Sequence, residues 1–117
     1  MKRGEIWTVS GGKDYAGNPR PVVIIQDDRF DATESITICP LTTAVTEAPL
    51  MRLTVVPNEQ NGLRTTSYLM ADKVTTVAKS KLGRRLGSLG VADAIGLDRM
   101  ILVFLGLTTS HQAEAGH

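Results

Sequence analysis

The chain has 117 residues, the size of one domain, and because only 4% of them are aromatic its core must be mostly Ile, Val and Leu. The formal net charge is +1, which excludes a globally basic nucleic-acid-binding protein and leaves a local patch as the route to any such contact. With one cysteine, Cys39, and two histidines near the end of the chain, an internal disulfide is excluded and neither a metal site nor another cofactor is expected.

Three short strands are expected in the first part of the chain. Residues 5–9 combine β-branched and aromatic side chains, and residues 22–25 form a continuous β-branched run that predicts a strand buried on both faces. Residues 36–39 alternate and end at Pro40. The Gly-, Asn- and Pro-rich segment before the second strand and the acidic segment after it are expected to be loops.

The middle of the chain continues the pattern of short strands. A Thr-rich loop is expected after Pro40, followed by a strand at 51–56 and a tight turn at Asn61-Gly62. Residues 67–70 and 73–77 predict two further short strands or one bent strand. Strands at such close, regular spacing predict a mostly β fold, a small SH3-like or Greek-key β-barrel.

The last part of the chain predicts a helix. Residues 82–90 are basic and punctuated by glycine, and are expected to form a solvated turn. Apolar residues at helical spacing then predict a C-terminal α-helix over 91–107 that packs on the barrel. Residues 1–107 are therefore expected to form one domain and 108–117 a flexible tail. Because no signal segment or membrane-length apolar run is found, a soluble cytoplasmic protein is expected.

Four blocks of sequence carry a more specific signal than the strand pattern. They are MKRGEIWTVS at 1–10, GNPRPVVI at 17–24, CPLTT at 39–43 and GLRTTSYLMADKV at 62–74. In order and spacing these blocks resemble the MazF/PemK/Kid family of bacterial toxins, over residues 1 to about 107. An Arg-Pro pair before a strand is common by itself. The specific signal is that all four blocks occur together, in the family's order and with its spacing.

The resemblance implies the toxin of a type II toxin–antitoxin system. Toxins of this family are homodimeric barrels that act as metal-independent, sequence-specific endoribonucleases. They cut single-stranded RNA to 2′,3′-cyclic phosphate and 5′-hydroxyl ends, which inhibits translation and growth. For this chain the resemblance implies a single-stranded RNA substrate, a homodimer, and a cognate antitoxin whose acidic C-terminal segment blocks the cationic groove by folding on it.

Arg20 is the first candidate for catalysis. Its guanidinium would stabilise the anionic phosphorane through two donors, and Pro21 would fix the backbone beside it. The alternative is a surface arginine in a salt bridge. No histidine lies in the matching blocks, so the general acid stays open between Arg20, Lys13 and a water molecule.

Two further catalytic candidates come from the third and fourth blocks. Thr42 would donate its hydroxyl to the scissile phosphate, with a turn-capping role as the alternative and the neighbouring Thr43 as a possible one-residue shift. Asp72 would act as the base for the 2′-hydroxyl if burial raises its pKa. The alternative, weighed about evenly, is an acid paired with Lys73 or Arg64.

Residues in the loops and at a strand end are the candidates for binding RNA, either by stacking on bases or by reading their edges. They are Lys13, Tyr15, Asn18, Gln26 and Thr43. Simple anchoring of the loop is at least as good an interpretation of Tyr15. A basic cluster could also hold RNA phosphates, although a solvated turn is the favoured interpretation. It consists of Lys79, Lys81, Arg84 and Arg85.

Two other functions compete with the ribonuclease. A non-catalytic toxin that poisons DNA gyrase, like CcdB, has the same fold but lacks the Arg-Pro pair and the threonine, so Arg20 and Thr42 together favour the ribonuclease. An SH3-like adaptor would need an aromatic-lined groove for Pro-rich ligands, and the few, scattered aromatics argue against one.

Overall fold

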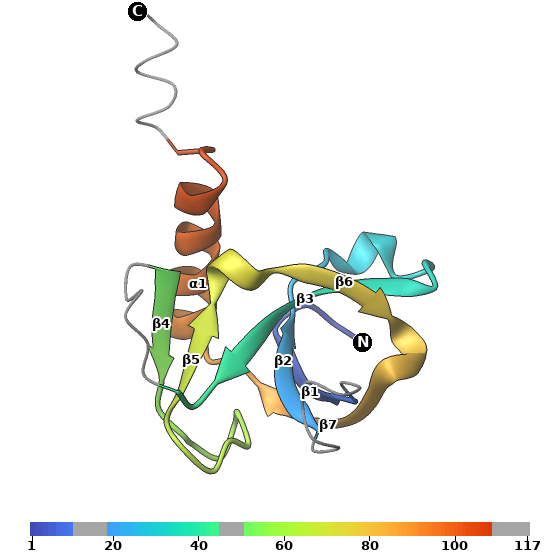
Figure 1. Cartoon of the computed structure of the whole chain (residues 1–117), viewed down its shortest axis with the longest axis horizontal. Helices are drawn as coiled ribbons and strands as arrows, with labels where there is room; N and C mark the ends of the chain where they lie inside the picture. The colour runs from blue at the N-terminus through green and yellow to red at the C-terminus, as the bar shows by residue number, and fades with distance from the viewer. Residues whose placement is uncertain (11–18, 45–50, 109–117) are drawn as a thin grey trace, which may run out of the picture.

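A computed structural model of the chain describes residues 1–10, 19–44 and 51–108. These residues form seven strands followed by one α-helix (Figure 1). The elements are β1 (Glu5–Val9), β2 (Arg20–Ile24), β3 (Ser35–Thr42), β4 (Arg52–Val55), β5 (Ser67–Met70), β6 (Thr75–Ala78), β7 (Leu82–Ser88) and α1 (Val91–Phe104). The predicted mostly β fold with a C-terminal helix is confirmed. No helix in the described part of the chain is long and apolar enough to span a membrane.

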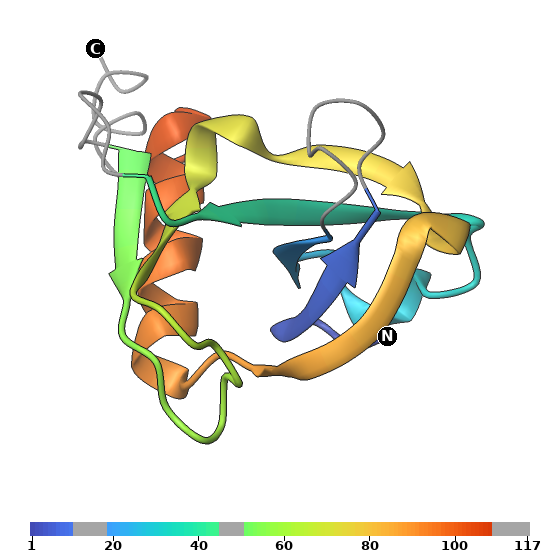
Figure 2. The same cartoon turned by 60° about the horizontal axis from the view of Figure 1, so that its bottom comes forward.

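The strands form an antiparallel sheet in the order β4-β5-β3-β2-β1-β7, with β6 paired to β3 beside this path. The long strand β3 connects the two parts of the sheet. It pairs with β6 and β2 over most of its length and with β5 at its last two residues, Leu41 and Thr42. The sheet curls strongly, and α1 lies beside β4 and β5 (Figures 1 and 2). The ends of β2 and β3 are thereby brought close to the bulged strand β7.

Central strands supply both halves of the core. Val23, Cys39 and Leu41 pack with residues of β1, β4 and β5 and with Leu97 of α1. Val22 and Ile24 belong to a second cluster with residues of β1 and β3, on the other face of the sheet. The alternation of side chains along β2 therefore buries both of its faces, as its unbroken β-branched sequence predicts.

Two strand boundaries in the first half of the chain differ from the prediction by two or more residues. β2 begins at Arg20 rather than at Val22, and β3 continues through Pro40 to Thr42. Pro40 lies where the ladder with β2 ends and β3 starts to pair with β5, a position where the missing N–H of proline is least costly. The predicted strand end at Pro40 is therefore wrong.

The solvated turn predicted at 82–90 is also wrong, because Leu82–Ser88 is strand β7. The glycines that indicated a turn are required by close contacts within the sheet. A Cβ on Gly83 would lie 2.4 Å from Thr8 Oγ1, and one on Gly87 would lie 2.3 Å from the carbonyl oxygen of Gln60. The register of β7 against β1 shifts twice, which marks β-bulges.

The second half of the chain otherwise follows the prediction closely. β6 is separate from β5, with the 3₁₀ turn Ala71–Lys73 between them, so the bent-strand alternative is wrong. Asn61-Gly62 lies inside the longer 56–66 loop and not in a tight hairpin turn. The helix ends at Phe104, three residues before the predicted boundary. Except for Thr108, the predicted tail lies outside the described residues.

Candidate functional site

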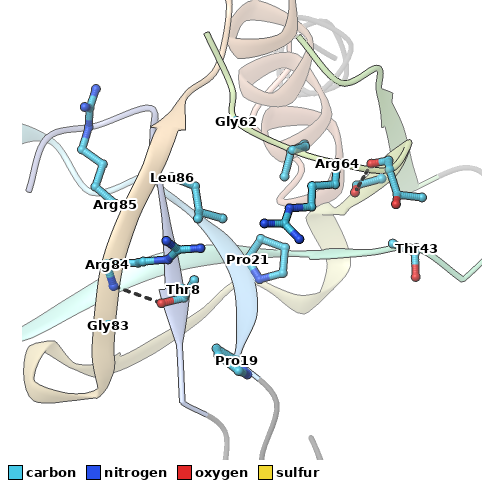
Figure 3. A pocket seen from close by; sticks show the side chains of 13 residues that line it. Thr8, Pro19, Pro21, Thr43, Gly62, Arg64, Gly83, Arg84, Arg85 and Leu86 are labelled. Atoms are coloured by element: carbon cyan, nitrogen blue, oxygen red, sulfur yellow. Dashed lines mark hydrogen bonds between the residues drawn. The ribbon is translucent and has the colours of Figure 1, made fainter. Parts of the chain in front are cut away.

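A hollow of about 760 Å³ opens where β2 begins and β3 ends (Figure 3). Its walls come from β1, β2, β7 and the loop before β5. They are formed by Thr8, Pro19, Pro21, Thr43, Gly62, Leu63, Arg64, Thr65, Ser67, Gly83, Arg84, Arg85 and Leu86. Three arginines and several hydroxyl groups are present and no acid is among these described lining residues, so the hollow favours an anionic ligand.

The wall formed by the 56–66 loop is held rigidly against β7. Asn61 is fully buried, and its side-chain Oδ1 accepts hydrogen bonds from the backbone N–H groups of Asn58 and Leu63, both at 3.0 Å. Gly62 has a φ of +68°, and a Cβ there would lie 2.1 Å from the carbonyl oxygen of Leu86. Only glycine fits this position, because both the backbone conformation and the close approach of the two chains exclude a side chain.

The opposite wall is fixed by a contact between β1 and β7. The backbone N–H of Arg84 donates a hydrogen bond of 3.0 Å to Thr8 Oγ1, at the bulge where the register of the two strands shifts (Figure 3). The side chain of Arg84 points into the hollow, as does that of Arg64 from the facing wall, whereas Arg85 points away. Arg85 instead pairs with Glu5, with 3.1 Å between Nε and Oε2.

Arg20 and Thr42, the first two catalytic candidates, lie at the same end of the sheet. The β2–β3 ladder ends at the pair Val22–Pro40, so Arg20, two residues before Val22, and Thr42, two residues after Pro40, both lie just beyond that end of the ladder. Arg20 is exposed, and the two residues that flank it in sequence, Pro19 and Pro21, line the hollow.

The two neighbouring threonines have different surroundings. Thr42 is only 9% exposed, and its Oγ1 accepts a hydrogen bond of 3.1 Å from the backbone N–H of Ala44, the turn-capping contact considered from the sequence. Thr43 is exposed and lines the hollow. In this structure Thr43 therefore presents the more accessible hydroxyl, while Thr42 is buried at the end of β3.

Asp72, the third catalytic candidate, lies away from the hollow. It sits in the 3₁₀ turn after β5, whereas Thr43 lies near the start of that strand. Its carboxylate forms an ion pair with the Arg52 guanidinium, and the two side chains are only 24% and 11% exposed. The pairing with Lys73 or Arg64 considered from the sequence is therefore wrong, since in the described part of the chain Asp72 pairs with Arg52.

The predicted RNA-binding residues are only partly placed. Lys13, Tyr15 and Asn18 lie outside the described residues. Gln26 lies beyond the far end of β2 from Arg20, and its amide is engaged by its own loop. Its Nε2 donates to the carbonyl oxygen of Phe30 at 2.9 Å, and its Oε1 accepts from the backbone N–H of Thr37 at 3.1 Å. Of these five candidates, the structure places Thr43 at the hollow.

The basic cluster predicted from the sequence is divided by the fold. Lys79 and Lys81 lie in the 3₁₀ turn before β7, where Lys79 pairs with Asp31. Arg84 and Arg85 lie on β7 at the hollow. Sequence reasoning missed Thr8, Thr65 and Ser67, because nothing in their local sequence indicates that distant segments meet there. It placed Arg64 in a matching block but assigned it to an ion pair.

Two ionisable groups near the core have displaced pKa values. Burial raises the pKa of the Cys39 thiol to about 12, so this cysteine is an unreactive core residue, as expected from its strand. Burial alone would raise the pKa of Glu5, but hydrogen bonds from the backbone of Lys2 and the indole of Trp7 outweigh it and lower the pKa. In the described residues, no group of three or more His, Cys, Asp or Glu side chains could hold a metal ion.

Sequence comparisons give a consistent relationship over nearly the whole chain. Residues 2–105 match the family described as PemK-like, MazF-like toxin of type II toxin-antitoxin system. A probable endoribonuclease MazF from Mycolicibacterium smegmatis is 53% identical over 107 residues, which are 92% of this chain and 98% of that protein. Endoribonuclease MazF9 of Mycobacterium tuberculosis is 28% identical, again over 92% of this chain and 98% of that protein.

Solved structures share the fold. A mycobacterial endoribonuclease in complex with its cognate antitoxin has a TM-score of 0.76 at 25% identity, covering 92% of this chain and 97% of that one. The Mycobacterium tuberculosis toxin MazF-mt6 has a TM-score of 0.74 at 25% identity, covering 89% of this chain and 98% of that one. A MazE–MazF complex from Deinococcus radiodurans has a TM-score of 0.74 at 14% identity, covering 92% and 97%.

Proposed function

Since this chain belongs to the PemK-like, MazF-like toxins of type II toxin–antitoxin systems and is an endoribonuclease of that type, we propose that it cuts single-stranded RNA without a metal ion, at the end of the sheet that carries Arg20 and Thr42. The observation that carries this proposal is that both residues lie just beyond the end of the β2–β3 ladder, beside a cationic hollow that their sequence neighbours line. Cutting of cellular RNA in the cytoplasm would inhibit translation and growth.

The proposed reaction is a transesterification within the RNA. The 2′-oxygen attacks the adjacent phosphorus as its proton is removed, and the bond from phosphorus to the 5′-oxygen breaks as that oxygen gains a proton. The products are a 2′,3′-cyclic phosphate and a 5′-hydroxyl, and no oxidant or cofactor is needed. The protein must therefore stabilise the anionic phosphorane and assist two proton transfers.

Arg20 is proposed to stabilise the phosphorane. Its charge persists at any physiological pH, and its planar fork of donors matches two phosphate oxygens. Pro21 restricts the backbone next to it, which lowers the entropic cost of presenting the side chain. The hydroxyl of Thr42 is proposed to donate to the same phosphate, with Thr43 as the alternative. The donor to the leaving 5′-oxygen is Arg20, Lys13 or water.

Two alternative roles remain for Asp72: a base for the 2′-hydroxyl, and one partner of a structural ion pair. A base for the 2′-hydroxyl must reach the RNA, whereas the Asp72 carboxylate is held by Arg52 away from the hollow. Its pairing favours the structural role within this protomer. Substitution of Asp72 by Asn separates the two roles, because it removes the charge and keeps the shape of the side chain.

The assembly is proposed to be a homodimer formed through α1. Val91, Ile95 and Leu102 recur at helical spacing and are exposed, although Leu97 on another face of the same helix is buried in the core. An exposed apolar stripe of this kind is unfavourable in water and is relieved by a second copy of the same surface. Residues 1–107 are taken as the domain that dimerises.

The inhibitor is proposed to be a cognate antitoxin with an acidic C-terminal segment. A structural neighbour has been solved in complex with its own cognate antitoxin. In this chain the cationic end of the sheet is the surface that suits acidic side chains, so the antitoxin segment and RNA would compete for it.

The proposal is tested with a long single-stranded RNA in excess EDTA, with the new ends mapped by primer extension. Wild type is expected to give discrete cuts with 5′-hydroxyl ends. Arg20→Ala should keep the fold and cut about 100- to 1000-fold more slowly. Arg29→Ala, which removes an exposed arginine beyond the other end of β2, is the matched control and should cut like wild type. Near wild-type cutting by Arg20→Ala would show that the proposed site is wrong.

A further inference from the structure

We propose that Arg64 and Arg84 form a second phosphate-binding subsite, which holds a backbone phosphate of the RNA next to the one that is cut. This inference rests on the proposed function, because it assigns a further contact to the same RNA. The proposed subsite lies in the hollow itself and does not include the proposed catalytic residues Arg20 and Thr42.

The first observation is the direction of the two side chains. Arg64 leaves the 56–66 loop and Arg84 leaves β7, and both guanidinium groups point into the hollow on the side of Pro21 (Figure 3). Both residues are exposed, and neither forms an ion pair with another described residue. Arg85, by contrast, has its charge matched by Glu5. Two like charges directed into one space are mutually unfavourable until an anion lies between them.

The second observation is that both arginines stand on rigid segments. Arg64 follows Asn61 and Gly62: the side chain of Asn61 forms buried hydrogen bonds within the loop, and the backbone of Gly62 packs closely on that of Leu86 in β7. The backbone N–H of Arg84 is held by Thr8. The two guanidinium groups therefore start from fixed points on opposite walls, and little ordering of the backbone is needed when a ligand binds.

The chemistry of the lining selects a phosphate. Guanidinium forks from two sides and the hydroxyls of Thr43 and Thr65 can approach a tetrahedral anion from several directions. A carboxylate accepts such donors mainly near its own plane, whereas the oxygens of a tetrahedral phosphate accept from more than one plane. Pro19 and Pro21 connect the hollow directly to Arg20, so an RNA strand with its scissile phosphate at Arg20 would continue across the hollow. An RNA phosphate is therefore favoured over an acidic peptide.

The test measures binding of an RNA oligonucleotide that spans a mapped cut and carries a 2′-deoxy nucleotide there, so that it binds but is not cut. Arg64→Ala and Arg84→Ala are each expected to weaken binding by roughly tenfold or more. The double variant should also change how binding depends on salt. In a plot of the logarithm of the association constant against the logarithm of the salt concentration, the magnitude of the slope should fall by about 0.7 for each RNA phosphate that the protein no longer neutralises. Arg64→Lys and Arg84→Lys should restore the slope, since they keep the charge.

Arg29→Ala is the matched control, because it removes one exposed arginine far from the hollow, and it should leave affinity and slope unchanged. Circular dichroism checks that each variant is folded. If wild type cuts RNA but the Arg64 and Arg84 variants keep its affinity and slope, the subsite is wrong and the proposed function stands. If the variants lose affinity only for a glutamate-rich peptide, the RNA assignment is overturned in favour of a protein partner. If wild type neither binds nor cuts RNA, both proposals fail.

Discussion

At the scale of single residues, the site depends on which side chain of each neighbouring pair faces the RNA. Arg20, the first residue of β2, lies between Pro19 and Pro21, which line the hollow. Thr42 and Thr43 alternate at the end of β3, with one buried and one exposed. A shift of one residue changes the face of the sheet on which a side chain lies, so these two threonines have distinct surroundings and are proposed to have distinct roles.

Thr42→Ala and Thr43→Ala are predicted to separate those roles. Thr42→Ala should lower the cleavage rate by a smaller factor than Arg20→Ala, because it removes a neutral hydroxyl donor to the phosphate and leaves the charged guanidinium in place. Thr43→Ala should mainly weaken RNA binding, because it removes a hydroxyl from the hollow. Single-turnover rates over a range of enzyme concentrations distinguish the two effects. A larger loss of rate in Thr43→Ala would transfer the proposed catalytic role to Thr43.

At the scale of elements, strands were predictable where local sequence decides them. β1 was predicted with its observed bounds, because its alternating β-branched and aromatic side chains specify a strand without help from the rest of the chain. β7 was missed because its glycines are explained only by contacts with Thr8 and Gln60, which are far away in sequence. Local patterns cannot reveal a glycine that is required by a distant segment.

The same limit applied to the candidate site. The positions of Arg20 and Thr42 came from the family resemblance, and in the fold both lie just beyond the same end of the β2–β3 ladder. The hollow is formed by five segments that meet only in the folded chain, so neither Thr8 nor the inward direction of Arg84 could be predicted. For Asp72 the sequence offered nearby cations as partners, whereas the fold supplies Arg52 from another strand.

Asp72→Asn is predicted to destabilise the fold. Loss of the carboxylate charge leaves the Arg52 guanidinium mostly buried without its counterion, which should lower the free energy of unfolding by about 2 kcal/mol or more. Urea denaturation measures this change, and the cleavage rate of the folded variant is measured in parallel. An unchanged rate supports the structural ion pair. A rate loss at full RNA affinity would instead assign Asp72 to proton transfer.

The contact between β1 and β7 is predicted to depend on pH through Glu5. Because hydrogen bonds outweigh burial and lower its pKa below 4.5, its stabilising effect is complete above that pH and is lost as the pH falls through the lower, folded-state value. Glu5→Gln should cost roughly 1–2 kcal/mol at pH 7, since Glu5 accepts from Trp7 and pairs with Arg85. Thermal denaturation from pH 7 to pH 3 should show the two proteins converging; a constant difference would contradict this role.

At the scale of the whole molecule, the curled sheet leaves two surfaces with different uses. The cationic end is the proposed RNA site, while the exposed apolar stripe of α1 is the proposed interface with a second copy. Separation of the two surfaces would let a dimer keep both of its RNA sites open. The small size of the chain makes the added burial at such an interface valuable to its stability.

Ile95→Asp is predicted to give a monomer. A charge placed without a partner in the apolar stripe should weaken dimerisation by roughly a hundredfold or more, while an exposed substitution costs the folded protomer little. Sedimentation velocity measures the change. Phe30→Asp is the matched control, because Phe30 is equally apolar and exposed but lies on the 3₁₀ turn after β2. A dimer that survives Ile95→Asp would place the interface elsewhere.

The central claim, that the RNA supplies its own nucleophile, is tested most directly by one substitution in the substrate. A cleavable RNA is compared, in excess EDTA, with the same RNA in which the nucleotide 5′ to the cut is 2′-deoxy. The account predicts that wild type binds both RNAs but cuts only the unmodified one, to a 2′,3′-cyclic phosphate and a 5′-hydroxyl. Cutting of the 2′-deoxy RNA at the same position would contradict it, because a hydroxyl that is absent cannot attack.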